Sequence, residues 1–115
     1  MTIKGIELPD IDLFDYESAE KWENAYEKLL KSINNIPENA RLSESIKAQC
    51  TAVFELFNDI FGDGTDKKIF GEKTNLKECL SAVEELKNAE SRYSEENSQE
   101  LKSLIAKYSP ERAER

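Results

Sequence analysis

The segment from Asp59 to Phe70, read DIFGDGTDKKIF, contains several oxygen-bearing side chains of the kind that a calcium loop uses. With Asp59 at the first loop position, Gly64 falls at the sixth, where such loops need a glycine. Phe61 then replaces an oxygen ligand, and Phe70 stands where the loop requires a bidentate glutamate. Two ligands are therefore missing, and we interpret the segment as a helix end followed by a loop, with no metal bound.

The other reactive groups lack the partners that catalysis needs. The chain has no histidine, which removes the commonest general base and a common metal ligand. Neighbouring carboxylates such as Glu84 and Glu85 point apart on a helix and belong to a solvated face. Cys50 and Cys79 lie among apolar residues, which predicts buried free thiols rather than a disulfide. The sequence therefore predicts a protein that is not an enzyme and has no cofactor, no catalytic residues and no metal site.

The charge of the chain restricts its partners. The 115 residues carry a net charge of −8, and the pI is about 4.7. Nucleic-acid phosphates and anionic membranes would be repelled, and no cluster of Lys and Arg offsets this. An acidic mimic of nucleic acid is the less favoured alternative to a solvated acidic surface. No signal peptide and no apolar run of about 20 residues is visible, so we expect a cytoplasmic protein with no membrane partner.

The central element is a helix that begins at Ser43 or Ser45 and ends at Gly62, which we expect in the left-handed conformation. After this helix, a short helical turn at Lys67–Phe70 is expected to fold Phe70 back on the core. The apolar stripe of the helix recurs at helical spacing and consists of Ile46, Cys50, Val53, Phe54, Phe57, Ile60 and Phe61.

A helix before the central one is predicted to begin near Asp15 or Ser18, either of which can cap it. Asn34-Asn35 and Pro37 end it, and Glu27 and Lys31 are spaced to form an i,i+4 ion pair. Its predicted apolar face consists of Ala19, Trp22, Ala25, Tyr26, Leu29, Leu30 and Ile33.

The last helix is predicted to begin at Thr74 or Asn75. Its first apolar face consists of Leu76, Cys79, Leu80, Val83 and Leu86, and the apolar pattern returns at Leu101, Leu104, Ile105 and Tyr108. Between these two groups of apolar residues, the apolar pattern is weak. The sequence is compatible with one long helix or with a break near Ser94–Ser98 followed by a short helix that folds back, and we favour the break.

The fold class expected from these elements is mainly α: a three- to four-helix bundle with a short N-terminal β-hairpin or extended arm. Pro9-Asp10 supplies the turn signal of the hairpin. Residues 1–109 are expected to form a single helical domain with the arm at 1–15, and residues 110–115 a disordered tail.

Aromatic residues are more numerous than two lone helices would bury. Most are expected in the core, and some are expected to form a patch for a protein partner. The predicted partner-binding residues are Trp22, Tyr26, Phe57, Phe61 and Phe70.

Residues 7–86 resemble a family of small acidic proteins from the tail-gene regions of phages and prophages of Gram-positive bacteria, taken to be tail assembly chaperones. The resemblance rests on a D-x-F-D arm at Asp12–Asp15 and an AE-x-(W/Y)-E helix at Ala19–Glu23. It also rests on a QC-x-x-(V/F)-F-x-x-F-x-x-(I/L)-FG-x-G helix at Gln49–Gly64 and an (I/V)FG-x-x-TNL-x-x-C segment at Ile69–Cys79.

The resemblance implies a tail assembly chaperone in the cytoplasm of the bacterial host, with no catalytic residues to transfer. Its partner would be a helical tail protein such as the phage tape measure, which apolar stripes would shield until the tube forms. Two alternatives stay open: a ring-forming structural component of the tail, and an acidic inhibitor of the antitoxin or immunity type. A homo-oligomer is compatible with each of them.

Overall fold

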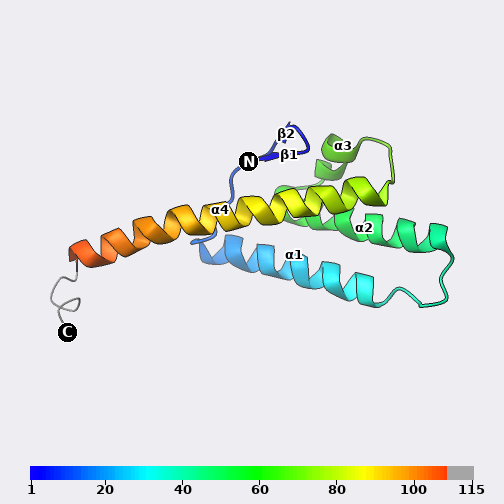
Figure 1. Cartoon of the computed structure of the whole chain (residues 1–115), viewed down its shortest axis with the longest axis horizontal. Helices are drawn as coiled ribbons and strands as arrows, with labels where there is room; N and C mark the ends of the chain where they lie inside the picture. Colours follow the sequence, from blue (N-terminus) through cyan, green and yellow to red (C-terminus); the bar gives the residue numbers. More distant parts are fainter. Residues whose placement is uncertain (109–115) are drawn as a thin grey trace. The chain divides into compact units, whose positions relative to one another are not determined.

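The computed structural model of the chain describes residues 1–108 and shows a mainly α protein with an N-terminal β-hairpin, which confirms the predicted fold class (Figure 1). The elements in order are β1 (Thr2–Ile3), β2 (Ile6–Glu7), α1 (Tyr16–Asn34), α2 (Leu42–Phe61), α3 (Thr65–Phe70) and α4 (Leu76–Tyr108). The predicted disordered tail at 110–115 lies outside the described residues.

The chain divides into two compact units. The first is Met1–Glu85 and contains the hairpin, α1, α2, α3 and the beginning of α4. The second begins at Leu86, and its described part is the remainder of α4. The prediction that both belong to one domain stays a prediction.

α2 contributes to the core of the first unit over a wide face. Four members of the predicted stripe are buried, and so are Ala52 and Leu56, which the stripe did not include. Ala52 and Leu56 lie one residue before Val53 and Phe57, so they are turned by about 100° around the helix from them. α2 therefore packs on two sides. Its buried residues are Cys50, Ala52, Val53, Leu56, Phe57 and Ile60.

α1 begins and ends as predicted. The Asp15 carboxylate caps the helix by accepting a hydrogen bond from the Ser18 N–H at 3.0 Å, and Asn35 lies at its C-terminal cap. The expected pair Glu27–Lys31 forms at 3.4 Å. Trp22, Ala25 and Leu29 are buried, but Leu30 is exposed. Its inclusion in the apolar face was wrong, because it lies about 100° beyond Leu29 around the helix.

Lys28 joins the two long helices of the first unit. Its ammonium is 3.3 Å from the Asp59 carboxylate and 3.7 Å from that of Glu55, both on α2. The hydrogen bond to Asp59 is the main reason why the pKa of Lys28 is raised above its usual value. Both carboxylates therefore lie on the side of α2 that faces α1.

α2 starts one to three residues earlier than the predicted serine caps. It begins at Leu42 with Arg41 in the capping position, so the prediction of Ser43 or Ser45 was wrong. An arginine side chain cannot accept a bond from the helix amides, but the Glu44 carboxylate accepts one from the Arg41 N–H at 3.4 Å. Gly62 ends the helix with φ +111° and ψ 158°, a positive φ outside the expected left-handed region.

α3 returns the chain to the core, as predicted for Phe70. The Phe70 ring lies 5.2 Å from that of Phe54 and 5.9 Å from that of Phe57, measured between centroids. The loop before α3 is closed by the Thr65 hydroxyl, which donates to the Gly62 carbonyl at 2.7 Å.

The hairpin turns at a different place from the one predicted. Its strands are Thr2–Ile3 and Ile6–Glu7, so the turn is Lys4-Gly5 and not Pro9-Asp10. Both turn residues have positive φ (52° and 79°), as a two-residue turn that matches the strand twist requires. Ile3, at 0% exposure, is buried.

Lys4 attaches the hairpin to the beginning of α4. Its N–H donates to the Glu85 carboxylate at 3.0 Å, and its ammonium lies 2.8 Å from Glu78 and 3.3 Å from the Ser81 hydroxyl. The hydrogen bond between Lys4 and Glu78 raises the pKa of the lysine and lowers the pKa of the carboxyl.

α4 is one continuous helix, and the favoured break near Ser94–Ser98 was wrong. Asn75 caps it as predicted, accepting the Glu78 N–H at 3.1 Å. No glycine or proline lies between Glu72 and Tyr108 to interrupt it. The Asn97 side chain donates to the Tyr93 carbonyl of its own helix at 2.7 Å, so it does not terminate the helix. Leu80, which the predicted face included, is exposed.

Because Phe57 is buried, its side chain should contribute strongly to the free energy of unfolding. Phe57→Ala should lower the free energy of unfolding by about 3–5 kcal/mol, because it leaves a cavity between α2 and α3. Phe14→Ala is the matched control: Phe14 is 57% exposed, and its loss should cost less than about 1 kcal/mol. Urea denaturation followed by circular dichroism measures both, and equal losses would contradict this description of the core.

Candidate protein-binding surface

The five predicted partner-binding aromatics lie in and around the core of the first unit. Trp22 is 4% exposed and Phe57 is fully buried, so both side chains belong to the core of this unit. Tyr26, Phe61 and Phe70 are half-buried. The structure brings the five into two groups: Trp22 with Tyr26, at 5.8 Å between ring centroids, and Phe57 with Phe61 and Phe70.

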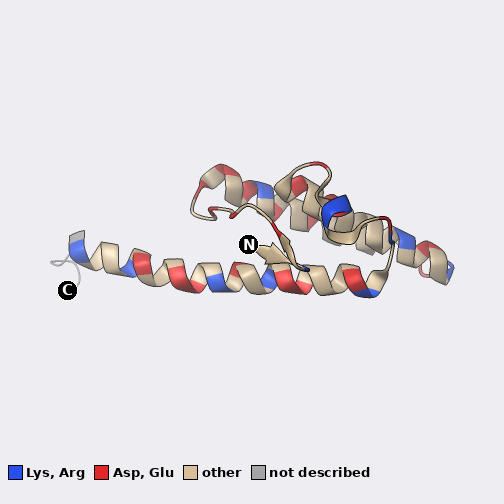
Figure 2. Ribbon diagram, turned by 90° about the horizontal axis from the view of Figure 1, so that it is seen from above, with Lys and Arg blue, Asp and Glu red and all other residues tan. Residues whose placement is uncertain are grey.

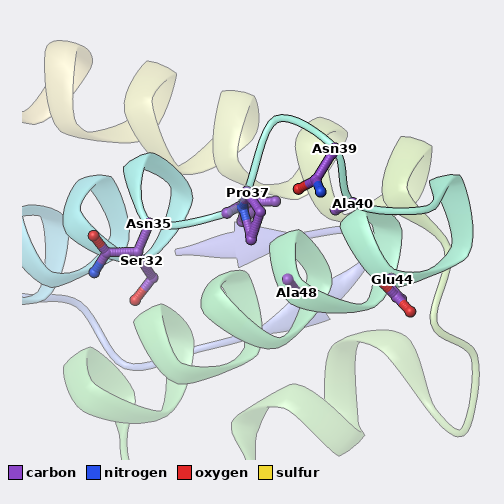
Figure 3. A pocket seen from close by; sticks show the side chains of 8 residues that line it. Ser32, Asn35, Pro37, Asn39, Ala40, Glu44 and Ala48 are labelled. Carbon is purple, nitrogen blue, oxygen red and sulfur yellow. The ribbon is translucent and has the colours of Figure 1, made fainter.

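A cavity of about 450 Å³ lies where α1 passes into α2 (Figure 3). Ser32 and Asn35 approach it from the end of α1, and Glu44 and Ala48 from the first turns of α2. The connecting segment covers one end. Its residues at the cavity are Ile36, Pro37, Asn39 and Ala40.

A second cavity, of about 530 Å³, continues from the first along the same two helices. Both are lined by Ser32, Asn35, Glu44 and Ala48, so they form one groove. We call this the α1–α2 groove. The second cavity adds Lys47, Thr51, Ala52 and Glu55.

The ion pair between Lys28 and Glu55 limits the groove at its far end. Glu55 lines the groove, and Lys28 lines a separate cavity of about 350 Å³ nearer the start of α1. The groove arises because Ser32, Ala48 and Ala52 are small. Larger side chains at these places would fill the space between the helices.

The α1–α2 groove is lined by polar groups and by small apolar side chains. Hydroxyl, amide and carboxylate groups offer hydrogen bonds around an inner surface of small apolar side chains, an arrangement common in ligand and peptide sites. Glu44 is exposed and already accepts the Arg41 N–H. Among the groove residues there is no cysteine, histidine or tyrosine that could act as a nucleophile or base beside a carboxylate.

The segment with calcium-like spacing has other contacts in the structure. Asp59 pairs with Lys28, and the Asn58 side chain accepts the Asp66 N–H at 3.0 Å. Within residues 1–108, no group of three or more Asp, Glu, His or Cys side chains is placed to hold a metal ion. In the same part of the chain, no helix has both the length and the apolar character needed to cross a membrane.

The two cysteines are buried free thiols, as predicted. Burial is the main reason why the pKa of Cys79 rises to about 12, and the neighbouring Cys50 thiol raises it further. A thiol held neutral in this way is a poor nucleophile. The cysteines therefore serve as core residues.

The chain belongs to a family of unknown function (DUF6673), whose model matches residues 4–115. A comparison with curated proteins finds no match. A comparison with solved structures finds none either.

The sequence interpretation missed the α1–α2 groove. Ala48, Ala52 and Ser32 are unremarkable in a helical pattern, and only the packing of α1 on α2 brings them to the same place. A signal was present in Ala48 and Ala52, two small residues one turn apart on the side of α2 away from its aromatic residues.

The raised pKa of Cys79 predicts a loss of stability in alkali. The unfolded thiol ionises near pH 9.0 and the folded one near pH 12, so in this interval the native state binds more protons than the unfolded state. The free energy of unfolding should therefore fall as the pH rises above about 9. Urea denaturation between pH 7 and pH 10.5 should show a shallower fall for Cys79→Ala, and identical slopes would contradict the assignment.

Proposed function

We propose that the protein is a non-enzymatic binding protein that holds a helical segment of another protein in the α1–α2 groove. The groove itself supports this best, because two neighbouring helices separated by small side chains leave the space that the third helix of a bundle would fill. Hydrogen-bonding groups at Ser32, Asn35 and Thr51 would orient the bound segment.

The resemblance of residues 7–86 to phage tail-region proteins supports a more specific proposal about this partner. We propose that the chain acts as a tail assembly chaperone and that the segment belongs to the tape measure or another helical tail protein. The acidic charge of the chain supports this role, since it would keep a complex with an aggregation-prone protein in solution.

The charges beside the groove favour a partner helix that carries both signs. Glu44 and Glu55 lie on one side of the groove with Lys47 between them in sequence. A helix whose basic residues meet the two carboxylates would be bound more tightly than a uniformly acidic one.

Filling the α1–α2 groove should abolish binding. Ala48→Phe should weaken binding of a tape-measure segment from the same phage at least about tenfold, because the added ring occupies the site of the partner helix. Ala106→Phe is the matched control: the substitution is the same, the residue is exposed, and it does not line the groove. Isothermal titration of the purified chain measures both, with circular dichroism to establish that each variant folds.

The outcomes separate the alternatives. Loss of binding in Ala48→Phe alone supports the proposal, and equal binding by both variants contradicts the groove. A chaperone should also be absent from finished particles. Its detection in purified virions by mass spectrometry would favour the structural tail component, and tight binding to a basic toxin would favour the inhibitor.

A further inference from the structure

The second unit exposes three large apolar side chains on one helical face. Leu101 and Leu104 are 45% exposed and Ile105 is 57% exposed. Their spacing of three and four residues places them together on α4. We call them the α4 apolar face. Isolated exposed apolar residues are ordinary on a protein surface, whereas a cluster of them indicates a contact site.

The charge of this part of the helix favours a second copy of the chain as the partner. Within Leu86–Tyr108, the basic and acidic side chains are equal in number, so the segment has no net charge although the whole chain carries −8. Figure 2 shows both signs along α4. The basic residues are Lys87, Arg92, Lys102 and Lys107, and the acidic ones are Glu90, Glu95, Glu96 and Glu100.

The order of these charges along α4 favours one relative orientation of the two copies. Carboxylates at Glu95, Glu96 and Glu100 precede the α4 apolar face, and Lys102 and Lys107 lie within and after it. In a parallel pair in register, each charge would lie opposite its own copy and repel it. Reversing one helix brings the carboxylates of each copy toward the lysines of the other.

We propose that two copies of the chain associate through the α4 apolar face as an antiparallel helix pair. Leu101 of each copy packs against Leu104 of the other, and Ile105 closes the side of the contact. In this register, Glu100 and Lys107 of the other copy lie within about 3 Å along the axis of being directly opposite. A lysine side chain spans such an offset easily.

Sedimentation equilibrium of the full chain over a range of concentrations tests the contact. Leu104→Glu should raise the dissociation constant of the dimer at least about tenfold, since it places a charge in the buried centre of the contact. Gln99→Glu is the matched control, because it introduces the same side chain about 140° away around the helix. Its dissociation constant should equal that of the wild type.

A wild-type chain that stays monomeric at about 1 mM would overturn the proposal. Equal weakening by both variants would overturn it as well, because the effect would then come from added charge and not from the apolar face. These outcomes do not involve the α1–α2 groove, so the proposed function stands or falls separately.

Charge reversal tests the orientation. Glu100→Lys and Lys107→Glu should each weaken the dimer about two- to fivefold, and the double variant should restore it. The two residues lie about two turns apart within one helix, so restoration reports a contact between copies. Single variants that weaken the dimer, with no restoration in the double variant, would exclude the antiparallel register.

Discussion

The first unit depends on the burial of α2 on two sides. Burying an apolar side chain of the size of Leu, Ile or Phe stabilises a fold by about 1.5–3 kcal/mol, and α2 buries several of them along with smaller residues. On one side, Phe57 contacts Phe70 of α3, and Cys50 lies beside Cys79 of α4. On the other, Lys28 of α1 pairs with Glu55 and Asp59. α1, α3 and the beginning of α4 are thus each in contact with α2.

Much of this organisation could be predicted from the sequence, because local signals encode it. Asp15 and Asn75 cap helices through hydrogen bonds within three residues, and Gly62 ends α2 by its backbone freedom. Where two local signals competed, the prediction failed. Ser43 and Ser45 are better caps than Arg41 in isolation, yet the helix extends past them, and Glu44 accepts the Arg41 N–H at its start. Lys4-Gly5 likewise formed the hairpin turn in place of Pro9-Asp10.

The α1–α2 groove could not be predicted in this way. A groove between helices forms where the side chains are too small to fill the space between them. The helical pattern of a sequence does not show whether an alanine packs against a large neighbouring side chain or leaves the space empty. The binding site was predicted at aromatic residues, but large aromatic side chains contribute strongly to a core and are therefore often buried. Most of the residues that line the groove are small or polar, and Ile36 and Pro37 are the larger apolar ones. Trp22 and Phe57 therefore belong to the core, and the partner-binding role of Tyr26, Phe61 and Phe70 stays a prediction.

The two proposed surfaces differ in chemistry, and the difference bears on how the proposed binding protein would release a bound helix. The α1–α2 groove offers small side chains and hydrogen bonds, so a bound helix would bury little large apolar area, and its dissociation would be fast. The α4 apolar face lies in a segment with no net charge, whereas the whole excess of negative charge lies in the first unit. Pairing through α4 would join two such grooves in one assembly. A long helical partner could then be held by two weak contacts whose effects combine through a high effective concentration, and it would leave once either the pair or one contact opened.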